Sequence, residues 1–136
     1  MILLDANILM YAAGAEHPHK AASVALLERV ATGAVDAAAD VEVLQEVLHR
    51  YRAIGRWHDG KRVYDLARTI VPTWLPVDVA VMDRARGLLE ADGTLSARDA
   101  LHAAVFLEVG AEALCSFDRD FDRIAGIRRI EPEDVL

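Results

Sequence analysis

The feature that most constrains the fold is an alternation of short apolar runs with longer segments of helical periodicity. The short runs predict extended segments at residues 1–4, 34–39, 73–78, 113–117 and 126–132. The longer segments predict helices at residues 19–33, 41–54, 60–71, 79–93 and 96–110. Strands and helices that alternate along a chain build a largely parallel sheet covered by helices, so we expect an α/β fold.

The length and composition indicate one domain over residues 1–136. A chain of 136 residues with 54% hydrophobic residues can bury a core of its own. The single cysteine, Cys115, lies in an apolar run and is expected to pack as a small hydrophobe. No segment approaches the roughly 18 uninterrupted apolar residues that a membrane span needs, which predicts a soluble, cytoplasmic protein.

The charge is unevenly distributed. A net charge of −7 argues at first against nucleic acid as a partner. Residues 49–68, however, contain six Lys or Arg and two Asp, a local charge of +4, with three interleaved aromatic residues. The basic residues that could contact RNA phosphates are Arg50, Arg52, Arg56, Lys61 and Arg62. The same pattern also fits the solvated face of two helices, and the sequence leaves both interpretations open.

Four acidic residues occupy positions of interest. Asp5 and Asp118 each follow a predicted buried strand directly, and ligands of open α/β sheets bind at that edge. Asp99 falls in the first turn of a largely apolar helix, where it either complements the helix dipole or borders a cleft. Glu46 lies beside the apolar arc of its helix, a position that is more often occupied by a solvated glutamate.

The run "DRDFD" at residues 118–122 alternates its acids as a calcium loop does. An EF-hand loop needs Gly at its sixth position and Glu at its twelfth, where this chain has Arg123 and Arg129. A calcium loop therefore fits poorly, and the acids form either a solvated charge run on a turn or a group of carboxylates gathered at the end of a strand for a metal site. We expect Asp120 either to support a site formed around Asp118 or to cap the next turn, and Asp122 to be solvated.

Taken in order, the motifs "LLDAN", "QEV", "SARDALHAA" and "CSFDRDF" resemble the PIN domain, in particular the VapC toxins of bacterial toxin–antitoxin pairs. The resemblance covers nearly the whole chain and implies a three-layer α/β/α sandwich with a mainly parallel central sheet. It also implies a catalytic metal site built from Asp5, Glu46, Asp99 and Asp118. Asn7 and Ser116 match the family's small polar residues, which implies that they supply supporting hydrogen bonds.

The chemistry that the resemblance implies is hydrolysis of RNA with Mg²⁺, or alternatively Mn²⁺. Clustered carboxylates repel one another unless divalent cations compensate their charge, and hard oxygen ligands suit these ions. The family further implies an RNA substrate, a small antitoxin of the VapB type and a homodimer.

Two alternative families require residues that this chain lacks. A response-regulator receiver domain needs an acidic pair near the first strand, where this chain has Asp5 alone. A haloacid-dehalogenase-like site needs D-x-D after the first strand, where this chain has "DAN". A third alternative, a PIN-like module that binds RNA or a partner without cutting it, is still possible.

His102, alone on an apolar helix, is expected to be a packed core residue.

Overall fold

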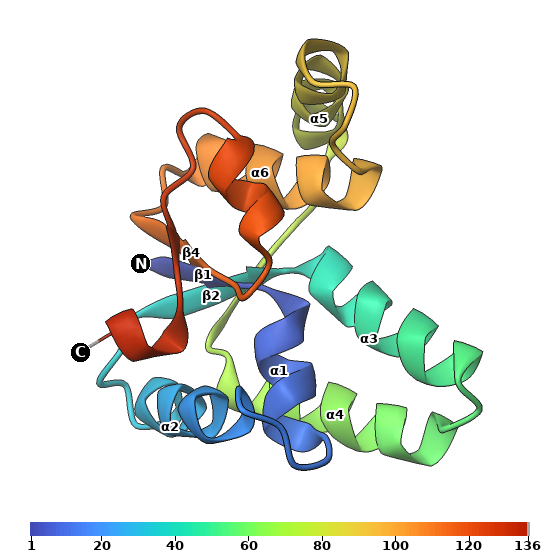
Figure 1. Ribbon diagram of the computed structural model, residues 1–136, viewed down its shortest axis with the longest axis vertical. Coiled ribbons are helices and arrows are strands. Elements are labelled where there is room, and N and C mark those ends of the chain that lie inside the picture. Colours follow the sequence, from blue (N-terminus) through green and yellow to red (C-terminus); the bar gives the residue numbers. More distant parts are fainter. Residues whose placement is uncertain (136) are drawn as a thin grey trace.

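A five-stranded parallel sheet forms the centre of the computed structural model, which describes residues 1–135 (Figure 1). The strands are β1 (Ile2–Leu4), β2 (Ala37–Asp40), β3 (Thr73–Leu75), β4 (Ala113–Cys115) and β5 (Arg129–Ile130). They lie in the order β3-β2-β1-β4-β5, and every neighbouring pair is parallel. Strands β1 and β4 are therefore neighbours in the sheet although they come from opposite ends of the chain.

Helices cover both faces of this sheet. The helices are α1 (Ala6–Ala13), α2 (Lys20–Ala31), α3 (Val41–Ala53), α4 (Trp57–Ile70), α5 (Val79–Ala91) and α6 (Ala97–Val109). Two short 3₁₀ helices follow, at Arg119–Arg123 and Pro132–Asp134. Figure 1 shows α5 and α6 on one side of the sheet and α1 to α4 on the other. The predicted three-layer α/β/α sandwich is confirmed.

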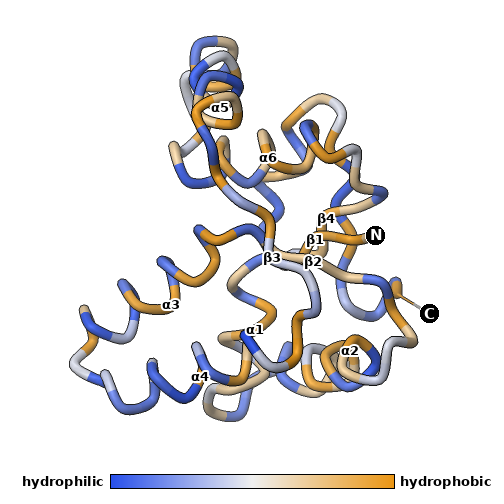
Figure 2. Tube along the Cα trace, turned by 180° about the vertical axis from the view of Figure 1, so that it is seen from behind, coloured by the Kyte–Doolittle hydropathy of each residue, from blue (hydrophilic) through white to orange (hydrophobic). Residues whose placement is uncertain are grey.

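The side chains of the central strands alternate between the two halves of the core. Ile2 and Leu4 pack among α1 to α4, whereas Leu3 packs among α5 and α6. This period of two is the ordinary consequence of the strand pleat. Cys115 is fully buried, as expected, and burial raises the pKa of its thiol to about 12. The central strands are accordingly mostly hydrophobic in Figure 2, whereas α4 is largely hydrophilic.

Helix α1 was not predicted from the sequence. The residues of α1 read "ANILMYAA" and show no polar face, so they continue the apolar run of the first strand. The structure ends β1 at Leu4 and begins α1 at once, with the Asp5 carboxylate accepting the Ala6 N–H. Asp5 therefore follows a strand and caps a helix at the same time.

Helix α4 begins at Trp57, three residues before the predicted start at Gly60. Gly60 is buried where α4 crosses α3, and a Cβ atom there would lie 2.5 Å from the Cβ of Tyr51. The glycine thus permits a close crossing inside a helix and does not mark its beginning.

The connections bring three helix starts to one edge of the sheet. Helix α1 follows β1 directly, α3 follows β2 directly, and Asp40 caps α3 through the Val43 N–H at 3.2 Å. Ser96 caps α6 through the Asp99 N–H at 3.1 Å. This edge, at the carboxyl ends of β1, β2 and β4, is where the candidate site lies.

Candidate metal centre

Asp5 is the most buried of the four predicted acids, with 8% of its surface exposed. One carboxylate oxygen accepts the Ala6 N–H at 2.7 Å, and the other accepts the Ser116 hydroxyl at 2.6 Å. Burial raises the pKa of Asp5 to about 6, although the charge of His102 and the Ser116 hydrogen bond oppose that rise. Neighbours thus hold the carboxylate in one orientation, in a setting that disfavours its charge.

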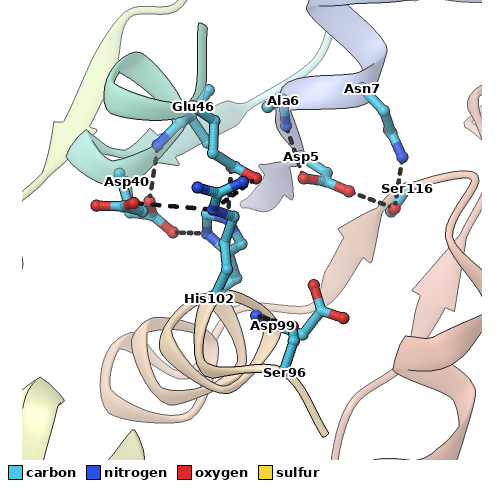
Figure 3. A network of polar contacts seen from close by, with 12 residues as sticks. Asp5, Ala6, Asn7, Asp40, Glu46, Ser96, Asp99, His102 and Ser116 are labelled. Carbon is cyan, nitrogen blue, oxygen red and sulfur yellow. Dashed lines mark hydrogen bonds and ion pairs between the residues drawn. The ribbon is translucent and has the colours of Figure 1, made fainter. Parts of the chain in front are cut away.

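Ser116 connects three parts of the site. Its hydroxyl donates to Asp5 and accepts from the Asn7 amide at 3.1 Å (Figure 3). The same hydroxyl accepts from the Asp118 N–H at 2.9 Å. The Asn7 carbonyl oxygen is buried and has no hydrogen-bond partner within residues 1–135. A buried oxygen without a donor is costly unless a water or a cation satisfies it.

Asp99 and Asp118 come from different elements and lie close to each other in the groove. Asp99 lies in the first turn of α6 and is half-buried; burial, with the nearby Asp118 charge, raises its pKa. Asp118 caps the 3₁₀ helix at Arg119–Arg123 through the Asp120 N–H at 2.9 Å. Asp99, Asp118 and the exposed Asp120 each offer an oxygen, and these oxygens all lie within 4.8 Å of one another.

Glu46 faces the groove from α3, and its side chain is 14% exposed. One of its oxygens accepts from His102 Nε2 at 2.8 Å, and the other lies 3.4 Å from Arg98 Nε. Asp5, Glu46 and His102 form a second group of potential ligand atoms within 4.8 Å of one another. The four predicted acids thus divide into two pairs, Asp5 with Glu46 and Asp99 with Asp118.

A single groove of about 660 Å³ contains both pairs. Its lining includes all four acids and Asn7, together with Arg50, Arg56 and Arg98. Arg50 and Arg56 therefore border the acids. Arg62 lines a neighbouring hollow instead, and Arg52 stacks 4.3 Å over the ring of Trp57. Of the basic residues named from the sequence, Arg52 and Lys61 line neither hollow.

The structure adds polar contacts to two residues whose exposure the sequence predicts correctly. His102 is buried, with 2% of its surface exposed, and both of its ring nitrogens contact carboxylates. Asp122 is half-exposed to solvent and also accepts a hydrogen bond from Arg129 at 2.9 Å. The sequence signal for His102 was its position, one helical turn after Asp99 on the same helix.

The groove suits a hard divalent cation. Its potential ligands are carboxylate oxygens and the unpartnered Asn7 carbonyl, which are the donors that Mg²⁺ and Mn²⁺ prefer. The carboxyl groups of Asp5 and Asp99 also have raised pKa values. A bound cation would lower these pKa values, because its charge stabilises the ionised carboxylates. The residues present therefore fit a metal site.

Comparison with known proteins identifies a family. The sequence matches the PIN domain family over residues 2–127. The chain belongs to that family. It is 45% identical to the ribonuclease VapC13 of Mycobacterium tuberculosis over 130 residues, which cover 96% of this chain and 99% of the relative.

Solved structures place the fold of this PIN domain with VapC toxins. A chain of VapBC2 from Rickettsia felis, solved with a fragment of promoter DNA, aligns with a TM-score of 0.76 at 20% identity. The alignment covers 96% of this chain and 98% of that one. VapC20 of M. tuberculosis, described as a toxin that cleaves the sarcin–ricin loop, aligns with a TM-score of 0.75 at 18% identity. That alignment covers 93% of this chain and 96% of VapC20.

Within residues 1–135 of this PIN domain, none of the helices combines the length and the apolar character that crossing a membrane requires.

Proposed function

We propose that this chain is a metal-dependent endoribonuclease and the toxin of a toxin–antitoxin pair. The observation that supports this most strongly is the convergence of Asp5, Glu46, Asp99 and Asp118 on one groove at the carboxyl edge of the sheet. The curated relative at 45% identity is named a ribonuclease, which supports the same activity here.

The proposed cofactor is Mg²⁺, with Mn²⁺ as the alternative. Asp5 and Glu46 would hold an ion on one side of the groove, and Asp99 and Asp118 on the other, with Asp120 and Asn7 in support. Bound divalent ions would supply an activated water and positive charge to stabilise the phosphate during in-line attack.

The protein's own residues would then orient the reaction. Ser116 and the Ala6 N–H hold the Asp5 carboxylate in place, so that it needs no rearrangement when RNA arrives. Arg50 and Arg56 are exposed residues of the groove lining, from which they can contact the phosphates that flank the cleaved bond. Hydrolysis would leave a 5′ phosphate and a 3′ hydroxyl, with no covalent enzyme intermediate.

The proposed partners follow from the family. Residues 1–136 would act as a single cytoplasmic PIN domain that forms a homodimer and binds a small antitoxin of the VapB type. The R. felis structure, which contains VapBC2 on promoter DNA, supports the antitoxin by analogy.

The test is an RNA cleavage assay with end analysis of the products. We expect the purified protein to cleave RNA with Mg²⁺ and to lose this activity in EDTA, leaving 5′-phosphorylated fragments. Asp5→Asn and Asp99→Asn, purified in parallel, should be inactive. Equal residual cleavage by all three proteins would mean a contaminating nuclease and would favour a silent RNA-binding module.

A further inference from the structure

Glu46 depends on another helix for its orientation. It projects from the middle of α3, where the backbone N–H groups are used within the helix, so no cap can hold its carboxylate. Both contacts to its oxygens come from α6. One is from His102 (Figure 3) and the other is from Arg98. The His102 hydrogen bond, at 2.8 Å, is the shorter and more buried of the two.

His102 is itself fixed at its far side. Its Nδ1 donates to Asp40 at 2.6 Å, and the other oxygen of Asp40 accepts the Val43 N–H that begins α3. Asp40 is 3% exposed. A continuous path of hydrogen bonds therefore runs from the start of α3, through the imidazole of α6, to Glu46 further along α3.

His102 contacts the groove through Glu46. Its Nδ1 lies 2.6 Å from Asp40 and its Nε2 lies 2.8 Å from Glu46, so a carboxylate occupies each ring nitrogen. Glu46 lines the groove, whereas His102 does not.

We propose that His102, held by Asp40, is a positioning residue that orients the Glu46 carboxylate toward Asp5 and the groove. The proposal rests on the proposed function, because Glu46 matters only if the groove holds a cation. Residues that orient the ligands of a metal typically change its affinity by about 10- to 100-fold when they are removed.

Two amide substitutions separate the two hydrogen bonds of His102. The side chains of Asn and Gln differ by one carbon, so their amide nitrogens reach different positions. The amide nitrogen of Asn can take the position of His102 Nδ1, and the amide nitrogen of Gln can take the position of His102 Nε2. His102→Gln should therefore keep the donor to Glu46 and lose the one to Asp40. His102→Asn should keep the hydrogen bond to Asp40 and lose the one to Glu46.

The measurement is Mn²⁺ binding, followed through the electron paramagnetic resonance signal of free Mn²⁺, with thermal unfolding to show that both variants fold. We expect His102→Asn to weaken binding at least 10-fold and His102→Gln to stay within about 3-fold of the unchanged protein. RNA cleavage should follow the same order, with the loss in kcat and not in KM.

The outcomes that overturn the proposal are distinct. Equal Mn²⁺ affinity in the two variants, whether both retained or both abolished, would show that the hydrogen bond to Glu46 is not what matters. If either variant does not fold, Asp40→Asn replaces it: Asn keeps the cap on α3 but offers His102 one acceptor fewer, and unchanged Mn²⁺ binding would reject the path. Absence of Mn²⁺ binding in the unchanged protein would instead reject the proposed function.

Discussion

At the scale of single residues, Asp5 is the most buried of the four proposed ligands. Its carboxyl group has a pKa of about 6, against 3.8 for an exposed aspartate. The folded protein therefore binds the Asp5 proton more tightly than the unfolded chain does, so rising pH destabilises the metal-free fold between these two values. Above pH 6 that destabilisation is fully present.

Replacing Asp5 with Asn should consequently stabilise the metal-free protein at neutral pH. The shift of about two pKa units corresponds to about 3 kcal/mol, and the loss of one hydrogen bond to the carboxylate subtracts about 1 kcal/mol. Urea unfolding in EDTA at pH 7.5 should show a net gain of about 1–2 kcal/mol, which shrinks as the pH falls from 6 toward 4. A variant less stable than the unchanged protein at every pH would contradict the assigned burial cost.

Adding a divalent cation should reverse this order of stability. An ion that binds only the folded state adds about 2.7 kcal/mol when its concentration is 100 times its Kd. The unchanged protein should gain this stability in Mn²⁺, and Asp5→Asn should gain little. Thermal unfolding with and without Mn²⁺ measures the difference, and equal gains in both proteins would place the ion elsewhere.

The sequence predicted some of these residues better than others. Asp5 and Asp118 could be placed because each follows a strand, and Asp99 because it follows a cap. Glu46 could not be distinguished from a solvated glutamate without the family resemblance, because its role depends on which residues of other elements lie beside α3. The burial of His102 was predicted, but its contacts were not, because its partners Asp40 and Glu46 are distant in the sequence and meet it only when α3 lies beside α6.

At the scale of elements, local signals placed most boundaries correctly. Asp40, Ser96 and Gly110 end or begin helices where the sequence predicts them. Helix α1 escaped prediction because its apolar residues have no periodic polar face to separate it from β1. The start of α4 was displaced because Gly60 reflects a tertiary crossing, which one segment of sequence does not reveal.

The crossing of α3 and α4 gives a prediction about Gly60. Alanine favours helices by up to about 1 kcal/mol over glycine, but a Cβ at Gly60 would meet Tyr51 at 2.5 Å. Gly60→Ala should therefore destabilise the protein by about 1–3 kcal/mol, as overpacking does. Gly87→Ala is the matched control in α5, where a Cβ meets nothing within 4 Å, and it should be neutral or stabilising. Urea unfolding compares them; equal effects would reject the close crossing.

At the scale of the whole molecule, the acidic net charge and the proposed RNA substrate are compatible because the charges are separated. The acids of the groove are buried or partly buried, where cations would neutralise them, whereas Arg50 and Arg56 of the same groove are exposed. The average charge of −7 therefore says little about the surface that RNA would meet.

This separation predicts which arginines matter for RNA affinity. Arg50→Ala and Arg56→Ala should each weaken binding and reduce the salt slope of log K by about 0.7 for each single-strand phosphate that the arginine no longer neutralises. Arg86→Ala removes the same charge from α5, on the other side of the sheet, and should leave the slope unchanged. Binding titrations at several salt concentrations measure this, and equal slopes for all three variants would place the RNA elsewhere.

The most direct test of the four-acid site is single-turnover cleavage of RNA in Mg²⁺ by a set of carboxamide variants. Asp5→Asn, Glu46→Gln, Asp99→Asn and Asp118→Asn should each lower the rate at least about 100-fold, since each removes a ligand charge from the metal site. Asp122→Asn, which removes an acid from the same loop as Asp118 but outside the groove, should leave the rate nearly unchanged. Loss of activity in the Asp122 variant to the same extent as in the other four, or retention in all five, would contradict a catalytic site built from these four carboxylates.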